Sequence, residues 1–113
     1  MNELKQKLRQ FAKARDWEQF HSPKNLAMAL SVEVAEIMEH FQWLTQEESK
    51  NLTGEKLEQI RHELGDILIF LVRLSDTLGI DPIIAANDKI KINEKKYPAD
   101  TVRGSAKKYS EYE

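Results

Sequence analysis

The amino-acid sequence predicts an all-α fold in which four main helices form a bundle unit. Apolar residues recur at intervals of three and four, and no stretch shows the alternation of a half-buried strand. Two dipeptides, Ser22-Pro23 and Asp81-Pro82, place a capping side chain before a proline at the first helical position, which is typical of a helix start. The 113 residues fit one domain with a small core of its own.

The apolar periodicity predicts helices over residues 2–15, 23–44, 55–78 and 82–96. A capping box formed by Thr45 and Glu48 indicates a short helical turn between the second and third helices. Gly79 is placed to end the third helix, and Tyr97-Pro98 is placed to end the fourth. We interpret residues 1–98 as the helical domain and 99–113 as a polar C-terminal tail of the same domain.

We expect the apolar stripes of the second and third helices to form the core. The stripe of the second helix contains Ala27, Leu30, Val34, Ile37, Met38 and Phe41. The stripe of the third helix contains Leu57, Ile60, Leu64, Ile67, Leu68, Leu71 and Leu74. Between 67 and 72 the third helix is apolar almost all round, which fits a buried central helix or an interface between two copies. We favour the interface, because a small bundle gains core by pairing.

Composition and charge exclude several classes of protein. The formal net charge of −2 offers no basic field for nucleic acid, and the absence of cysteine excludes disulfides and thiolate metal sites. The polar, amphipathic N-terminus does not resemble a signal peptide, and the longest apolar run is too short to span a bilayer. We therefore expect a cytoplasmic protein with neither nucleic-acid nor membrane partners.

Two pairs of acidic residues are the most informative feature of the chain. Glu33 and Glu36 lie in the second predicted helix, and Glu63 and Asp66 lie in the third, each pair within an apolar neighbourhood. A spacing of three puts both members of a pair on one face of a helix. Antiparallel packing of the two helices would let all four meet, and a divalent cation would offset their repulsion. The alternative is that they are ordinary charges flanking an apolar stripe.

Four carboxylate ligands would favour Mg²⁺, with Mn²⁺ as a substitute, over zinc. A di-iron site is set aside, because none of Glu33, Glu36 and Glu63 has a histidine three residues on. Since Mg²⁺ usually shares its shell with phosphate oxygens, the acids point to a phosphorylated substrate. Lysines toward the end of the chain could meet that charge, although surface lysines are also common for solubility. Trp17 and Trp43 are candidates to stack on a base, or else plug the core.

Several motifs together resemble the MazG-like all-α nucleoside triphosphate pyrophosphohydrolases, and in particular their dCTP pyrophosphatase branch. The acids form an ExxE…ExxD signature, which is short, but the resemblance extends over nearly the whole chain. The further matching stretches are 15–21, 23–26, 41–43, 66–69, 96–98 and 103–109.

The resemblance implies cleavage of a nucleoside triphosphate between the α and β phosphates, giving the monophosphate and pyrophosphate, with Mg²⁺ held by the four acids. It implies a four-helix unit that forms a homodimer or homotetramer, and a role in cleaning the nucleotide pool. Glu36 or Glu63 would act as the catalytic base. The substrate-binding positions that it implies are Trp17, His21, Asn25, Trp43, Phe70, Lys89, Asn93, Lys96 and Tyr97.

Two departures from the branch bear on the choice of nucleotide. Phe70 stands where the branch often has tyrosine, and Leu8 stands where it can have histidine. Losing one hydrogen-bonding group can alter discrimination strongly. The alternatives are therefore dATP, a damaged dNTP or a broad dNTP range. Outside enzymes, the alternatives are a non-catalytic nucleotide sensor and a helical protein-interaction module.

Overall fold

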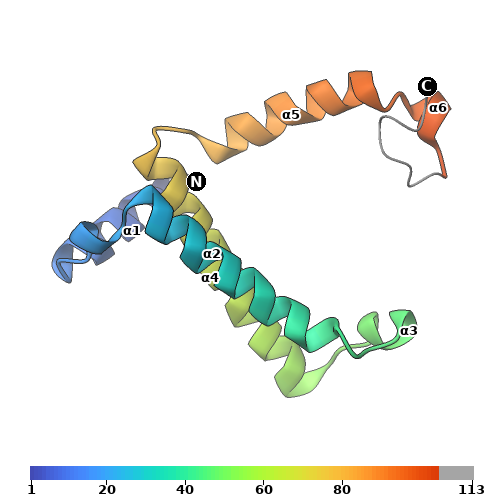
Figure 1. Cartoon of the computed structure of the whole chain (residues 1–113), viewed down its shortest axis with the longest axis horizontal. Coiled ribbons are helices and arrows are strands. Elements are labelled where there is room, and N and C mark those ends of the chain that lie inside the picture. Colours follow the sequence, from blue (N-terminus) through green and yellow to red (C-terminus); the bar gives the residue numbers. More distant parts are fainter. Residues whose placement is uncertain (105–113) are drawn as a thin grey trace. The chain divides into compact units, whose positions relative to one another are not determined.

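A computed structural model of the chain describes residues 1–104 (Figure 1). All secondary-structure elements assigned to these residues are helices. The all-α prediction is therefore confirmed. The elements are α1 (Asn2–Ala14), the 3-10 turn η1 (Glu18–Phe20), α2 (Pro23–Phe41), α3 (Gln46–Ser49), α4 (Gly54–Thr77), α5 (Pro82–Lys96) and α6 (Ala99–Val102). Helix α2 ends three residues earlier than expected. The short α6 lies in the predicted polar tail, whose residues 105–113 lie outside the described part.

Local hydrogen bonds explain where the helices begin. Ser22 Oγ accepts a hydrogen bond from the backbone N–H of Asn25 at 3.1 Å, which caps α2. Asp81 caps α5 in the same way. Thr45 and Glu48 form both bonds of the predicted capping box, which confirms the short helix α3. Gly79 follows α4 with a φ of +68°, a conformation that favours glycine.

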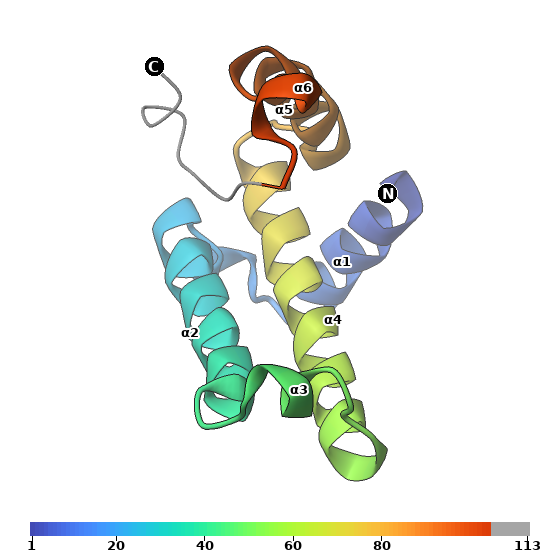
Figure 2. The ribbon, with the colours of Figure 1, turned by 90° about the vertical axis from the view of Figure 1, so that its right-hand side faces the viewer.

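The chain divides into two compact units, Met1–Ile80 and the part from Asp81 onward, and each is described by itself. In the first unit α2 and α4 run antiparallel and side by side, joined through α3, and α1 packs on α4 (Figure 2). The fully buried apolar residues among those described are Ala12, Leu26, Ile60 and Val72. No described helix combines the length and apolar character needed to cross a membrane.

The predicted core stripes are wrong in part. Leu30, Ile37, Phe41, Ile60, Ile67 and Leu74 are buried or half-buried, as expected. Six other stripe residues are 38–60% exposed, namely Val34, Met38, Leu57, Leu64, Leu68 and Leu71, and Ala27 is exposed as well. The faces of α2 and α4 that pack together include polar residues. The apolar stripe predicted from hydrophobicity therefore does not coincide with the face through which α2 and α4 pack.

Candidate metal and nucleotide site

The four predicted acids are electrostatically coupled across the contact between α2 and α4. Glu33 and Glu36 come from α2, and Glu63 and Asp66 come from α4. Burial raises the pKa of the Glu33 carboxyl, and the nearby charges of Glu36, Asp66 and Glu63 raise it further, as does a hydrogen bond that protonated Glu33 donates to Glu36. The charge on acids from both helices therefore acts on Glu33, and the meeting of the four at one metal site stays a prediction.

His40 contacts the cluster from α2. Its Nε2 lies 2.9 Å from Glu63 Oε2, and both side chains are less than one-fifth exposed. That carboxylate oxygen has no aligned hydrogen bond, so the contact is a close approach of the two groups rather than a well-formed hydrogen bond. Glu36 lies one turn before His40 on the same helix, but the ring of His40 contacts Glu63 of α4 instead.

The donor chemistry of the cluster fits a hard divalent cation. Two buried carboxylate oxygens accept no aligned hydrogen bond: Glu33 Oε2, and Glu63 Oε2, which has the ring of His40 beside it at 2.9 Å. Buried anionic oxygens without partners are costly, and a cation would satisfy them. No three histidine or acidic side chains among residues 1–104 lie close enough to hold a metal ion as they stand. A metal site formed by these acids would therefore need rotation of their side chains.

An apolar pocket of about 230 Å³ adjoins the acids at one residue, Asp66. Trp17 lies edge-on to Phe11, with ring centroids 5.7 Å apart, and edge-on to His21 at 6.4 Å. The pocket is lined by Leu8, Phe11, Trp17, His21, Asp66, Ile69, Phe70 and Arg73. The mostly apolar lining suits an aromatic ring. A ring bound there would lie next to Asp66, one of the four predicted acids.

The connector between α1 and α2 holds Trp17 and His21 in this pocket. Asp16 has a φ of +53°, which turns the chain after α1, and the N–H of Trp17 bonds back to the carbonyl of Ala12 at 2.9 Å. Asn25 Nδ2 donates to the carbonyl of Phe20 at 3.1 Å and so ties α2 to η1. Asn25, an expected substrate-binding residue, therefore braces the connector and does not line the pocket.

The structure brings some of the expected binding residues together and leaves others apart. Trp17, His21 and Phe70 share the pocket with Asp66, and the two departures from the branch, Leu8 and Phe70, both line it. Trp43 is 84% exposed and does not line this pocket. The remaining expected residues belong to the second unit, where α5 carries Lys89, Asn93 and Lys96 and ends before Tyr97.

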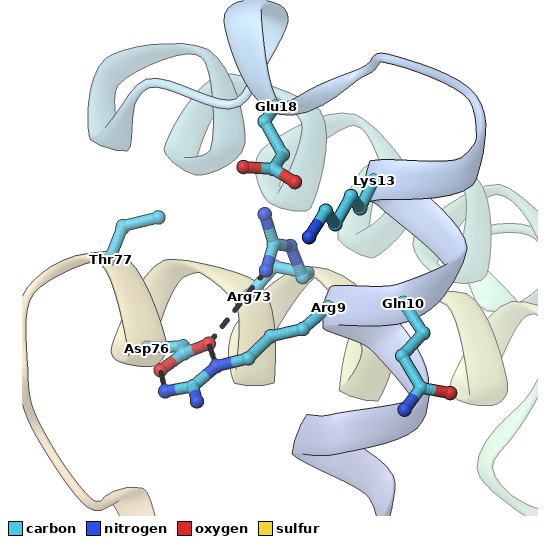
Figure 3. A pocket seen from close by; sticks show the side chains of 7 residues that line it. All are labelled: Arg9, Gln10, Lys13, Glu18, Arg73, Asp76 and Thr77. Atoms are coloured by element: carbon cyan, nitrogen blue, oxygen red, sulfur yellow. Dashed lines mark hydrogen bonds and ion pairs between the residues drawn. The ribbon is translucent and has the colours of Figure 1, made fainter.

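Sequence reasoning missed Arg73, which lies at the end of the pocket. It is only 8% exposed. The available signal was an arginine inside the apolar run of α4 with Asp76 three residues later, since a buried cation needs a partner. Arg73 also lines a second, larger cavity of about 470 Å³ beside Arg9 and Asp76 (Figure 3).

That larger cavity is a poorer candidate for a substrate site than the smaller aromatic pocket. Its acidic and basic groups largely pair with one another: Arg9 donates two hydrogen bonds of 2.6 Å to Asp76. None of the four clustered acids lines it. The lining residues are Arg9, Gln10, Lys13, Glu18, Arg73, Asp76 and Thr77.

Comparisons with known proteins show the family of the chain. The model of the MazG-like family matches residues 28–112. The chain is 42% identical to dCTP pyrophosphatase 1 of Homo sapiens over 90% of its own length and 61% of that protein. It is 43% identical to dCTP pyrophosphatase 1 of Bos taurus, covering 62% of it, so it spans about three-fifths of these curated relatives. The crystal structure of a pyrophosphatase from Archaeoglobus fulgidus is similar, with a TM-score of 0.77 and 43% identity over 87% of this chain and 92% of that one.

Proposed function

Because this chain belongs to the MazG-like family, we propose that it is a Mg²⁺-dependent nucleoside triphosphate pyrophosphohydrolase. Its substrate is a deoxynucleoside triphosphate, dCTP or a related dNTP, and its products are the monophosphate and pyrophosphate. The observation that carries the proposal is the position of Asp66, at which the carboxylate cluster and the aromatic pocket adjoin. The names of the relatives, dCTP pyrophosphatase 1, support the choice of nucleotide.

The carboxylates of Glu33, Glu36, Glu63 and Asp66 would hold Mg²⁺ between α2 and α4. When bound, Mg²⁺ would neutralise triphosphate charge and lower the pKa of a water molecule; Mn²⁺ would substitute. We assign removal of the water's proton to Glu36 or Glu63. His40, whose Nε2 lies 2.9 Å from Glu63, is placed to orient that carboxylate.

The base would enter the aromatic pocket and stack against Trp17 and Phe70, which line it. Trp43, exposed beyond the end of α2, would cover the base from outside this pocket. From the family resemblance we keep Lys89, Asn93, Lys96 and Tyr97 as the residues expected to contact the phosphates and sugar. Cleavage of unwanted dNTPs would then clean the nucleotide pool.

We also propose that the active protein is a homodimer or homotetramer. Helices α2 and α4 carry many exposed apolar residues, while their acids lie toward the contact between the two helices. A second copy of the chain could therefore cover the apolar residues and leave the acids accessible. Leaving so much apolar surface in water is unfavourable.

Pyrophosphate release from a panel of canonical and modified dNTPs and NTPs, with Mg²⁺, tests the reaction. We expect release from dCTP to fall at least about a hundredfold in Glu63→Gln, because general base or metal-ligand function is lost. Glu39→Gln makes the same chemical change at an exposed residue of α2. It is the matched control and should keep full activity. Release that persists in Glu63→Gln would contradict the role of the acids. No release from any nucleotide by the folded wild-type chain would favour a sensor or an interaction module.

A further inference from the structure

Arg73 is a buried cation whose hydrogen-bonding groups are only partly used. Its Nη2 lies 3.3 Å from His21 Nδ1, and its Nη1 lies 3.7 Å from Asp76 Oδ2. Its Nε is buried and has no hydrogen-bond partner among residues 1–104. A buried donor without an acceptor is costly, so the guanidinium is only partly satisfied in this structure.

The contact with Arg73 determines which nitrogen of His21 carries a proton. A guanidinium only donates hydrogen bonds, so Nδ1 of His21 must accept. In the neutral ring the single proton then lies on Nε2, which becomes a donor. Burial and the charge of Arg73 both lower the pKa of His21, while Glu18 acts weakly in the opposite direction, so the ring is neutral near pH 7.

Arg73 is itself held by ionic contacts. Asp76 accepts two hydrogen bonds of 2.6 Å from Arg9 of α1, and it faces Arg73 from one turn along α4 (Figure 3). Lys13 and Glu18 line the same cavity. The orientation of the guanidinium toward His21 therefore depends on both helices and not on the side chain of Arg73 alone.

Both His21 and Arg73 line the aromatic pocket, whose other side chains, apart from Asp66 and the indole of Trp17, are apolar. Leu8 and Phe70 contribute no hydrogen-bonding group. With Nδ1 of His21 accepting from Arg73, the Nε2–H of His21 is left as the donor that this pair presents to the polar edge of a base.

We propose that Arg73 determines specificity: it fixes His21 as an Nε2–H donor, and the pair selects a base whose edge presents acceptors. Cytosine offers two adjacent acceptors, N3 and O2, whereas thymine and uracil place an N–H donor at N3. The selection of a base rests on the proposed function, but the tautomer of His21 does not.

The tautomer can be measured without any nucleotide. Long-range ¹H–¹⁵N correlation spectra of the full chain report which ring nitrogen of each histidine carries a proton, and the chain has three histidines to assign. We expect His21 to be the Nε2–H form in the wild type, a mixture in Arg73→Met, and partly restored in Arg73→Lys, which keeps a donor. An Nδ1–H or charged ring at pH 7, or a tautomer unchanged in a folded Arg73→Met, would overturn the proposal.

The selectivity is measured as the ratio of kcat/KM for dCTP to that for dTTP. We expect Arg73→Met to lower this ratio about tenfold or more, and Arg73→Lys to give an intermediate value. Arg61→Met, an exposed change on the same helix, should leave it unaltered. Equal loss of both activities in Arg73→Met and in Arg73→Lys, with the ratio kept, would show a merely structural role. A wild-type chain that hydrolyses no nucleotide would overturn the proposed function and the selectivity, while the spectra would still decide the tautomer.

Discussion

Asp76 links α1 to α4 through charge, and its pKa reflects that link. Hydrogen bonds from Arg9 are the main reason that the pKa of Asp76 lies below its usual value of 3.8, with further contributions from the charges of Arg9, Lys5 and Arg73. The same contact raises the pKa of Arg9, so the two shifts agree in direction. Asp76 is nearly buried and Arg9 is half-exposed. Removing the carboxylate of Asp76 therefore tests the contribution of this ion pair to stability more directly than removing the guanidinium.

We expect Asp76→Asn to destabilise the protein in a pH-dependent way. A carboxyl whose folded pKa is depressed adds stability above its unfolded pKa, and that stability disappears as the pH falls through the lower folded pKa. The melting temperature of Asp76→Asn should therefore lie about 5 °C below that of the wild type at pH 6, and the gap should close below pH 4. Thermal unfolding followed by circular dichroism from pH 3 to pH 7 measures it. Asp100→Asn, at an exposed pair, is the control. A gap that stays constant over the whole range would contradict this account.

At the scale of the helices, the sequence predicted the ends well and the packed faces poorly. The caps at Ser22, Thr45 and Asp81 depend on neighbours within four residues, so local sequence was enough to place them. Which face of α2 meets α4 depends on the partner helix: Val34 and Met38 are exposed, whereas Glu33 and Glu36 are half-buried. Hydrophobic periodicity cannot detect a contact face that includes charged residues.

The acid cluster should oppose the stability of the α2–α4 pair until a cation binds. Glu33→Gln removes one of the coupled charges while keeping the size of the side chain. We therefore expect this variant to melt at a higher temperature than the wild type in EDTA. The wild type should gain about 2–3 kcal/mol when Mg²⁺ and an α,β-imido analogue of dCTP are at about a hundred times the dissociation constant.

Differential scanning fluorimetry measures both effects, and Glu33→Gln should lose most of the gain from Mg²⁺ and the analogue. Glu39→Gln, exposed on α2, should behave like the wild type in both conditions. A wild type that shows no shift with millimolar Mg²⁺ and analogue, or a Glu33→Gln that shows the full shift, would argue against the metal site.

At the scale of the whole molecule, local spacing could predict only those parts of the candidate site that lie on one pair of helices. The ExxE and ExxD spacings, with antiparallel packing, were enough to predict that the acids of α2 and α4 influence one another. Trp17 and His21 enter the pocket through the turn at Asp16, and Arg73 depends on Arg9 from a distant part of the chain. Such contacts between separate elements leave little signal in a single sequence.

The exposed apolar faces of α2 and α4 predict how many copies the active protein contains. Leu64 and Leu68 are 55% and 41% exposed and lie one turn apart on α4. Because the single chain buries so few apolar side chains completely, we expect a second copy to complete the core. Light scattering coupled to size-exclusion chromatography should give two or four times the chain mass of 13.2 kDa.

The double variant Leu64→Glu and Leu68→Glu should dissociate and lose most of its thermal stability, because it places charges inside the expected interface. Gln59→Glu adds a charge on the opposite side of the same helix, by the helical spacing of 100° per residue, and should keep the wild-type mass. If the wild type elutes as a monomer at micromolar concentration with a cooperative melting transition, the apolar faces need another explanation. If instead it is an oligomer that the double variant does not disrupt, the interface lies on other residues.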